Sequence, residues 1–330
     1  MSVPVTLCIF SYNQENFIRD AVESAFAQQF SPLEIIFSDD CSTDRTFSII
    51  EEMAAAYIGP HLVRLRREPV NVGTVQHVIN AARAAKGDLM VVAAGDDVSY
   101  PDRVATLYAA WRDSGAAAMA SWHDEIDEEG KVLRREVSFP PSNVVQKMFA
   151  AEPQAHRSNG IIETIPGFSA AYPRGFWANL PDTPGPLLAE DGFASTLVIL
   201  RGERIHRVPR SLIAYRIVER SLTVRAGGLS YDDIRSRERK IAYRATDLVA
   251  TMNFLIDQVG REGLTIHPRT MMWFRNARNH GMVTAGFWEI GSVARFLRLF
   301  RIQIWDDARF LIPRLFGFRL FAALRRMLKK

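Results

Sequence analysis

The amino-acid sequence predicts an α/β fold, with a mostly parallel sheet flanked by helices and a C-terminal helical region after it. Three observations support this prediction. Short apolar runs alternate with segments of helical spacing, which is the pattern of βαβ units. The runs are apolar throughout, as strands covered on both faces are. Polar and acidic clusters directly follow several of the runs.

The first hundred residues contain four expected strands and three expected helices. The apolar runs that predict strands are 3–10, 33–38, 61–67 and 87–94. Apolar residues recur every three or four positions in the expected helices, which are 17–28, 45–57 and 75–85. Asp44 or Ser42 is the expected N-cap of the second helix.

After residue 115 the alternation is less regular. Two strands joined by a turn at Glu129–Gly130 are expected within 116–139, and a long loop over 140–165. A helix is expected over 189–202, a strand over 204–217, and helical structure from about residue 226. We therefore expect an α/β domain at 1–225 and a helical region at 226–330.

The charge of the chain is unevenly distributed. Its 41 basic and 37 acidic residues give +4, while residues 295–330 hold ten basic and two acidic residues, or +8. Residues 1–294 therefore carry 4 − 8 = −4. An acidic body without a recognition motif argues against nucleic acid as a partner.

The sequence is typical of a cytoplasmic protein. Two cysteines, Cys8 and Cys41, define no disulfide framework and favour a reducing compartment. The N-terminus has no signal-peptide pattern, and no uncharged apolar run approaches the roughly 18–20 residues of a spanning helix. We expect at most a peripheral association with the inner face of the plasma membrane.

Several common site motifs are missing from the sequence. There is no G-x-G-x-x-G after the first expected strand, no P-loop, no Cys/His set with zinc spacing and no G-x-S-x-G elbow. These absences argue against dinucleotide, P-loop, zinc and serine-hydrolase chemistry.

The stretch AAGDDVSYPDR (93–103) places Asp96 and Asp97 side by side at the end of an expected strand. Mg²⁺ or Mn²⁺ binds one or two carboxylates together with substrate phosphate oxygens, so a metal would explain the pair. Gly95 would permit the turn that brings both carboxylates to one site. The alternative is a solvated turn before a helix capped by Ser99 or Asp102.

Four motifs in order carry a family resemblance: VTLCIFSYNQENF with FSDDCSTDRT, then NVGT, AAGDDVSYPDR and AEDGF. Together they resemble the inverting nucleotide-sugar glycosyltransferases of family 2, which have the Rossmann-like GT-A fold. The resemblance covers about residues 3–225, two-thirds of the chain. It implies a nucleoside-diphosphate sugar donor, most often a UDP-sugar, and a divalent metal, Mn²⁺ or Mg²⁺.

The resemblance assigns the nucleobase end of the donor site. Tyr12 matches a position beside the nucleobase, where its ring could stack, and Asn13 follows it in the same site. Asp39 matches the residue that accepts a hydrogen bond from the base, and Asp40 is expected to support the turn. A surface aromatic is the alternative reading of Tyr12.

The resemblance also assigns the diphosphate end of the site. Asn71 and Gly73 match a loop near the nucleotide, although an ordinary turn is an equal reading. Asp96 would face the ribose or the metal, and Asp97 would bind the metal.

Asp191, in the AED motif, matches the general base, and Glu190 is the alternative. An inverting transfer needs a carboxylate opposite the leaving diphosphate, to take the proton of the attacking hydroxyl. Acidic residues are also favoured at a helix N-terminus, so a purely structural reading exists.

Two departures from the family pattern concern the metal. Ala94 stands where an earlier acid could be, and no histidine follows YR near Val218. Water or Glu219 could complete the coordination, or arginines could neutralise the diphosphate: Arg216, Arg220 and Arg225. A solvated basic face is the alternative for these arginines.

The C-terminal segments 294–305 and 308–330 mix arginine with Phe, Leu, Ile and Trp. This pattern suits helices lying in an anionic membrane interface through residues 295–330. The alternative is a helical subdomain packed on the core. A membrane-adjacent transferase would suit a glycan or lipid-linked acceptor, as in bacterial surface polysaccharide synthesis.

The sequence thus predicts an inverting, metal-dependent glycosyltransferase. A non-catalytic nucleotide-sugar-binding or membrane-recruited scaffold protein is the alternative. A sugar-1-phosphate nucleotidyltransferase would need a glycine-rich loop with Arg and Lys after the first strand, and SYNQEN has none.

Overall fold

A computed structural model describes residues 3–139, 143–158, 160–187, 190–218 and 231–285. The chain divides into two compact units, Met1–Ser221 and Leu222–Lys330, and each is described by itself. Several sequence predictions lie outside the described residues: the domain boundary at 225, Glu219, Arg220, Arg225 and the basic segment 295–330.

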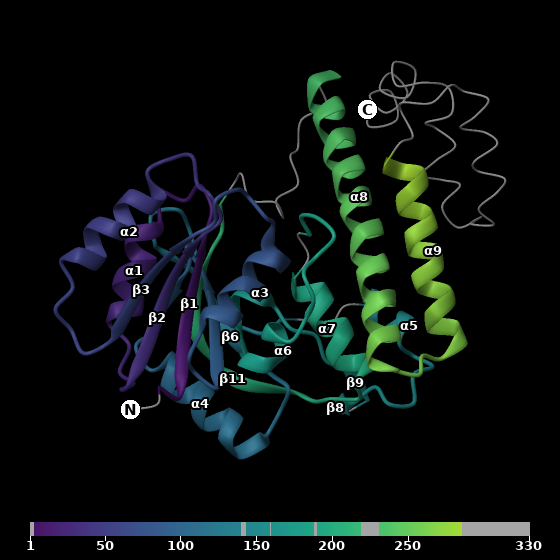
Figure 1. Cartoon of the computed structure of the whole chain (residues 1–330), viewed down its shortest axis with the longest axis horizontal. Coiled ribbons are helices and arrows are strands. Elements are labelled where there is room, and N and C mark those ends of the chain that lie inside the picture. Colours follow the sequence, from purple (N-terminus) through teal and green to yellow (C-terminus); the bar gives the residue numbers. More distant parts are fainter. Residues whose placement is uncertain (1–2, 140–142, 159, 188–189, 219–230, 286–330) are drawn as a thin grey trace. The chain divides into compact units, whose positions relative to one another are not determined.

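One sheet forms the centre of the first unit (Figure 1), with the strand order β3-β2-β1-β4-β10-β6-β11-β5 and β7 paired to β6. The strands are β1 Val5–Ser11, β2 Leu33–Asp39, β3 Leu62–Arg67, β4 Leu89–Ala94, β5 Val98–Ser99, β6 Ala118–Ile126, β7 Val132–Val137, β10 Ala170–Pro173 and β11 Ile205–Arg216. The helices are α1 Ile18–Phe26, α2 Thr46–Ala55, α3 Thr74–Ala84, α4 Arg103–Ser114, α6 Arg174–Ala178 and α7 Glu190–Leu200, with a 3₁₀ turn η1 at Gly167–Ser169.

The first four strands of the sheet are parallel. β1 pairs with β2 on one side and β4 on the other, so Ser11 lies opposite Asp39 and Phe10 opposite Ala94. Apolar side chains of these strands pack against α1, α2 and α4 in the main core cluster. The predicted α/β architecture is confirmed, and the ends of β1, β2 and β4 meet at one edge.

The second half of the sheet is mixed. β10 runs antiparallel between β4 and β6, whereas β11 runs parallel to β6 with two irregularities in its register. The sequence did not predict β5 or β10, because runs of two and four residues are too short to show a period.

The long loop expected over 140–165 contains three short elements of regular structure. The segment forms α5 (Asn143–Met148) and a hairpin of β8 (Arg157–Ser158) and β9 (Ile161–Ile162). Gln146 connects α5 to the hairpin. Its Nε2 donates to the Ile162 carbonyl at 2.6 Å, and its Oε1 accepts from the Ile162 backbone amide at 3.0 Å. Such long-range polar contacts leave no periodic signal in the sequence.

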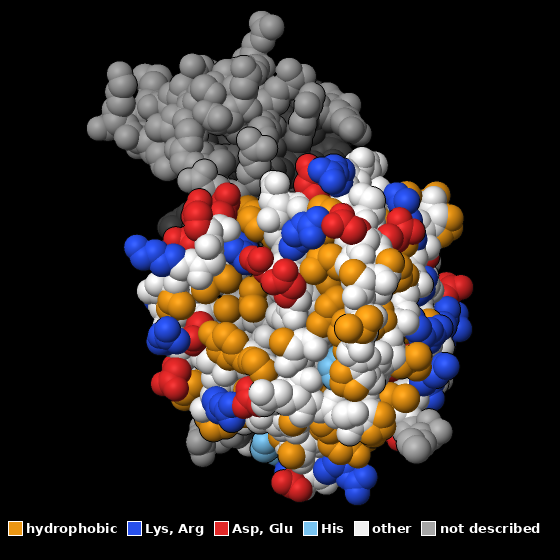
Figure 2. All heavy atoms as spheres, turned by 90° about the vertical axis from the view of Figure 1, so that its left-hand side faces the viewer, with side chains coloured by type: hydrophobic (Ala, Val, Ile, Leu, Met, Phe, Trp, Pro, Cys, Tyr) orange, Lys and Arg blue, Asp and Glu red, His pale blue; other side chains and the backbone are white. Residues whose placement is uncertain are grey.

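β3 is the outer strand at one end of the sheet. Its Leu62 and Leu65 are exposed, and the same strand carries Arg64, Arg66 and Arg67. The side of the molecule on which α2 lies in Figure 1 shows hydrophobic patches interspersed with charges of both signs (Figure 2). Charged side chains along an edge strand disfavour pairing with another chain.

The described part of the second unit is a pair of helices that pack on each other, α8 (Tyr231–Glu262) and α9 (Pro268–Ala285). Gly263, with a φ of +64°, ends α8 in the left-handed conformation that glycine adopts readily. The expected helical character is confirmed for these residues. None of the described helices is both long and apolar enough to cross a membrane.

Candidate active site

The carboxyl ends of β1, β2 and β4 bring three polar pairs to one edge of the sheet. Tyr12 and Asn13 follow β1, Asp40 follows Asp39 at the end of β2, and Asp96 and Asp97 follow β4. Because these strands are neighbours in parallel register, the pairs lie along one rim, where ligands of open α/β sheets bind.

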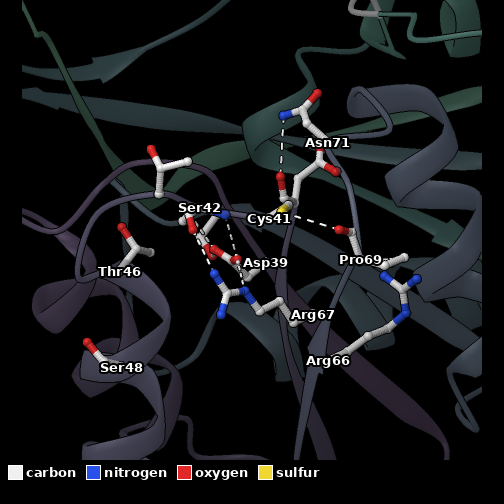
Figure 3. A network of polar contacts seen from close by, with 12 residues as sticks. Asp39, Cys41, Ser42, Thr46, Ser48, Arg66, Arg67, Pro69 and Asn71 are labelled. Carbon is white, nitrogen blue, oxygen red and sulfur yellow. Dashed lines mark hydrogen bonds and ion pairs between the residues drawn. The ribbon is translucent and has the colours of Figure 1, made fainter.

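Asp39 is fully buried and holds the β2–α2 turn (Figure 3). Its Oδ1 accepts the Ser42 amide at 2.8 Å and lies 3.5 Å from Nε of Arg67, while its Oδ2 accepts from the hydroxyls of Ser42 and Ser11. Arg67 also donates to the Ser42 carbonyl at 2.7 Å. In this arrangement the carboxylate shapes the turn, and base recognition by Asp39 stays a prediction.

Tyr12 and Asn13 have different environments although they are adjacent. The Tyr12 side chain is 48% exposed at the rim, so its ring is open to stacking. Asn13 has a φ of +52°, and its Oδ1 accepts the Thr43 amide at 2.8 Å. The backbone N–H of Asn13 donates to Ser42 Oγ at 2.9 Å. Asn13 therefore links the loops that follow β1 and β2.

Asp40 supports the 71–73 turn, which lies in a different loop from its own DDCSTD segment. Its two carboxylate oxygens accept the amides of Val72 at 2.8 Å and Gly73 at 3.1 Å. Asn71 Nδ2 donates to the Asp40 carbonyl at 3.3 Å. Gly73 has a φ of +80°, and a Cβ there would lie 2.9 Å from Pro186. Close packing and backbone conformation both require glycine at this position.

Asp97 is the strongest metal-ligand candidate in the described residues. It is 2% exposed, its Oδ1 accepts the Arg216 amide at 3.0 Å, and its buried Oδ2 has no hydrogen-bond partner there. Burial raises the pKa of Asp97 well above its ordinary value, and the neighbouring Asp96 raises it further. Burial also raises the pKa of Asp96. This environment contradicts a solvated Asp-Asp turn.

The two carboxylates fit a divalent cation bound together with a diphosphate. An unpartnered, buried carboxylate oxygen beside a second carboxylate is relieved by a positive charge. The described residues contain no group of three or more His, Cys, Asp or Glu arranged to hold a metal. Mg²⁺ and Mn²⁺ need only one or two protein carboxylates when substrate phosphate oxygens complete the shell.

Gly95 serves the site in a different way from the one expected. Its backbone is not left-handed, so no special turn conformation requires glycine. A Cβ there would lie 2.6 Å from Gln14 Oε1 and 2.9 Å from Ile18 Cδ1. The ends of the Gln14 and Ile18 side chains therefore pack directly against the Gly95 backbone, and a larger residue would require them to move. No local pattern predicts these contacts.

Arg216 joins four segments around Asp97. Its Nε donates to the Asp96 carbonyl at 2.9 Å, and its Nη1 to the carbonyls of Asp127 and Glu128. Its Nη2 donates to Asp20 Oδ2 at 2.6 Å. The Arg216 side chain is 1% exposed. The suggestion that Arg216 neutralises a diphosphate is therefore wrong, because its guanidinium is buried and hydrogen-bonded to other residues of the chain.

Arg216→Ala is expected to lower the free energy of unfolding by about 3–5 kcal/mol, because it leaves the carbonyls of Asp96, Asp127 and Glu128 without their donor. Arg210→Ala on the same strand is the control, since the Arg210–Asp102 pair is largely exposed and worth about 0–1 kcal/mol. Urea unfolding measures both. Equal losses in the two variants would contradict the joining role of Arg216.

Asp191 and Glu190 form the first turn of α7. Burial raises the pKa of Asp191, and its Oδ1 accepts the Gly192 amide at 2.6 Å. Gly167 lies directly against them, since a Cβ there would be 2.5 Å from Glu190 Oε1 and 3.5 Å from Asp191 Cβ. Because η1 also contacts β4, the N-terminus of α7 is connected to the strand that ends at the acidic pair.

Two buried residues near the site were missed by sequence reasoning. Tyr172 is fully buried, and its hydroxyl has no partner in the described part of the chain. Burial raises the pKa of Tyr172, and the carboxylates of Glu190 and Asp191 raise it further. Arg103 is also buried and donates to the carbonyls of Val92 and Phe168. In the sequence, Arg103 is the last residue of the AAGDDVSYPDR stretch, which was already of interest. No sequence motif included Tyr172.

A known protein family matches the part of the sequence that carries most of this site. The family described as glycosyl transferase family 2 matches residues 6–177, just over half of the chain. The chain belongs to glycosyl transferase family 2. The matched part contains β1 to β10 and the acidic pair, whereas α7 and β11 lie beyond it.

Two relatives illustrate how far the family 2 similarity extends. An uncharacterised protein of Mycobacterium tuberculosis is 26% identical over 258 residues, which are 77% of this chain and 68% of that protein. The succinoglycan biosynthesis protein ExoO of Rhizobium meliloti is 30% identical over 130 residues, or 39% of this chain and 36% of ExoO.

Solved glycosyltransferases share the fold at low sequence identity. TarS of S. aureus in complex with UDP-GlcNAc has a TM-score of 0.51 and 16% identity, over 86% of this chain and 82% of that one. The mannosyltransferase PcManGT of Pyrobaculum calidifontis, in complex with GDP-Man and Mn²⁺, has a TM-score of 0.55 and 18% identity, over 100% and 88%. The predicted GT-A fold is thereby confirmed.

Proposed function

We propose that this family 2 glycosyltransferase transfers one sugar, with inversion, from a nucleoside-diphosphate sugar to a hydroxyl of a glycan or lipid-linked acceptor. The observation that carries the proposal is the buried Asp97 carboxylate beside Asp96, with one oxygen that has no partner among the described residues, at the edge where Tyr12 is exposed. A UDP-sugar is the proposed donor. TarS and PcManGT, which share the fold, are complexed with nucleotide sugars that differ in their base.

The nucleotide end of the proposed site is the rim of β1 and β2. The Tyr12 ring would stack on the base, beside the turn that Asp39 and Asn13 hold in place. The 71–73 loop, fixed by Asp40, would border the nucleotide. A preformed loop reduces the ordering that binding would otherwise require.

Asp96 and Asp97 would hold the divalent metal together with the donor's diphosphate. When bound, the metal supplies a positive charge that stabilises the leaving diphosphate. Arg103 and Arg216 fix the position of this turn and are themselves committed to backbone carbonyls.

Asp191 is the proposed general base. The acceptor oxygen attacks the anomeric carbon as the bond from that carbon to the diphosphate oxygen breaks, and the electron pair leaves with the nucleoside diphosphate. The acceptor's proton passes to a carboxylate oxygen of Asp191, on the opposite face of the sugar. Burial prepares this group, because it raises the pKa and makes the carboxylate a better proton acceptor.

The biological setting is proposed to be polysaccharide synthesis, in keeping with the name of the relative ExoO. Residues 295–330 are proposed to contact an anionic membrane surface at the cytoplasmic face, since they carry ten basic and two acidic residues among aromatic ones. Flotation of the full chain with phosphatidylglycerol vesicles, compared with phosphatidylcholine vesicles, tests this contact.

Thermal unfolding with a panel of nucleoside diphosphates, each with and without Mn²⁺, tests the donor site. We expect one nucleotide to raise the unfolding midpoint only when metal is present. At 100 times Kd the stabilisation is about 2.7 kcal/mol, which is readily measured. The corresponding nucleotide sugar is then expected to release nucleoside diphosphate with metal. Binding without any turnover would instead support the non-catalytic alternative.

A further inference from the structure

Two aromatic side chains stack on each other, and each belongs to a residue next in sequence to one that lies against a candidate catalytic group. The rings of Phe168 and Tyr215 have centroids 4.3 Å apart and planes inclined by 27°. Both side chains are partly exposed. His123 packs edge-on against both, at 5.0 Å from Phe168 and 5.8 Å from Tyr215. Phe139, 36% exposed, meets the edge of Phe168 at 6.4 Å.

The chain places each residue of this pair next to a residue of one chemical centre. Phe168 directly follows Gly167, the residue that lies against Glu190 and Asp191. Tyr215 directly precedes Arg216, whose amide donates to Asp97. The stack therefore connects the base side of the site with the metal side.

The pair is held rigidly by the buried groups around it. The Phe168 carbonyl accepts from Arg103 Nη2 at 3.0 Å, and Tyr215 pairs with Glu125 in the β11–β6 register. Burial lowers the pKa of His123, so this residue is neutral near pH 7 and packs as an aromatic ring. Its Nδ1 is buried and has no partner among the described residues. Rigid aromatic faces beside an unsatisfied polar atom are typical of ligand sites.

We propose that Phe168 and Tyr215 form a stacking platform for the sugar ring of the acceptor, so that the acceptor is a glycan ending in a pyranose. A pyranose presents a face of C–H groups with partial positive charge, which the negative face of an aromatic ring attracts. This inference rests on the proposed function and names its substrate class. It excludes a lipid phosphate or a protein side chain as the direct acceptor.

The position of the platform assigns it to the acceptor and not to the donor nucleotide. The nucleotide end is formed by the loops after β1 and β2, where Tyr12 is exposed. In an inverting transfer, the attacking hydroxyl must lie next to the base, on the side away from the diphosphate. Phe168 follows Gly167, whose backbone lies next to Glu190 and Asp191. A pyranose stacked on Phe168 could therefore direct one of its hydroxyls to the Asp191 carboxylate.

The test compares transfer with donor hydrolysis in the same preparation. The probes are α- and β-p-nitrophenyl hexopyranosides, with the nucleotide sugar that the wild-type enzyme hydrolyses. Tyr215→Leu and Phe168→Leu are each expected to lower the ratio of transfer to hydrolysis at least tenfold and to raise KM for the glycoside. Because the ratio is taken within one sample, loss of folded protein does not change it.

Tyr108→Leu is the matched control. Tyr108 is a partly exposed aromatic that packs on Phe30 at 5.3 Å, in α4, without contact to the carboxylates. It is expected to keep the wild-type ratio, and Tyr215→Phe, which keeps the ring, is expected to stay within threefold.

Three results would overturn the platform. An unchanged ratio in both leucine variants would show that the rings do not bind the acceptor. Hydrolysis by the wild-type enzyme without acceleration by any glycoside would reject a sugar ring as the acceptor. No turnover of any donor would contradict the proposed function itself, and the platform with it.

Discussion

Asp191→Asn is expected to lower kcat for sugar transfer by about 10²–10⁴-fold, because the variant cannot accept the proton of the attacking hydroxyl. The amide keeps the shape of the side chain and its acceptor oxygen for the Gly192 amide, so the fold should survive. Donor affinity, measured by thermal shift, should change little, since the donor diphosphate is proposed to bind at Asp96 and Asp97.

Glu190→Gln is the matched control for this prediction. Glu190 lies next to Asp191 in the same helical turn and carries the same charge, so a general electrostatic effect would appear in both variants. We expect a loss below tenfold for Glu190→Gln. A large loss there with near wild-type activity in Asp191→Asn would move the base to Glu190.

The pH profile provides a second measure of Asp191. The base must be ionised to act, and burial raises its pKa above the ordinary value of about 3.9. As the pH decreases, activity should therefore begin to fall at a higher pH than it would with an unperturbed aspartate. This acidic limb of the pH profile should disappear in Asp191→Asn. A profile that keeps the same limb in the variant would assign it to another group.

Asp97→Asn is expected to abolish metal-dependent nucleotide binding while making the fold more stable at neutral pH. The lost leaving-group stabilisation should reduce transfer by at least about 10²-fold, since such charge stabilisation is worth several kcal/mol. In the folded state the pKa of Asp97 is raised, so between the unfolded and folded pKa values the folded protein binds more protons.

The sign of the stability change follows from this difference in proton binding. The free energy of unfolding falls as pH rises through that window, and above the folded pKa the buried carboxylate costs stability. Asparagine removes this cost, so the unfolding midpoint should rise by about 2–4 °C for each kcal/mol gained. The gain should vanish at a pH low enough to protonate Asp97 in both states.

Asp113→Asn is the control for Asp97→Asn, because Asp113 is an exposed aspartate of α4. It should change neither the midpoint nor the metal dependence. A lower midpoint for Asp97→Asn at pH 8 would contradict the predicted cost of the buried carboxylate. A retained metal-dependent shift with nucleotide would show that Asp97 is not the metal-binding carboxylate.

Periodicity and motifs were sufficient for the first half of the chain and not for the rest. β1 to β4 and α1 to α3 lie close to the expected ranges, because each is long enough to show its period. β10 has four residues, and only its pairing between β4 and β6 makes it a strand. Such elements depend on tertiary contacts that a local pattern does not contain.

The same difference between local patterns and long-range contacts applies to the candidate site. The sequence identified Asp97 and Asp191 through motifs, and the structure adds their burial. It could not show that Asn13 and Asp39 hold a turn, or that Arg216 joins four segments, because those contacts join residues that are far apart in the sequence. The long-range partners of an arginine are invisible until the sheet is assembled.

The place of β11 in the sheet has a consequence for dissecting this enzyme. β11 comes after the family-matched residues 6–177 in the chain, yet it pairs along β6 and supplies Arg216. A fragment ending at residue 177 would leave the β6 edge uncovered and aggregation-prone, and Asp97 without its anchoring amide. We therefore expect the family-matched region not to fold on its own, so that a minimal enzyme has to extend through Arg216.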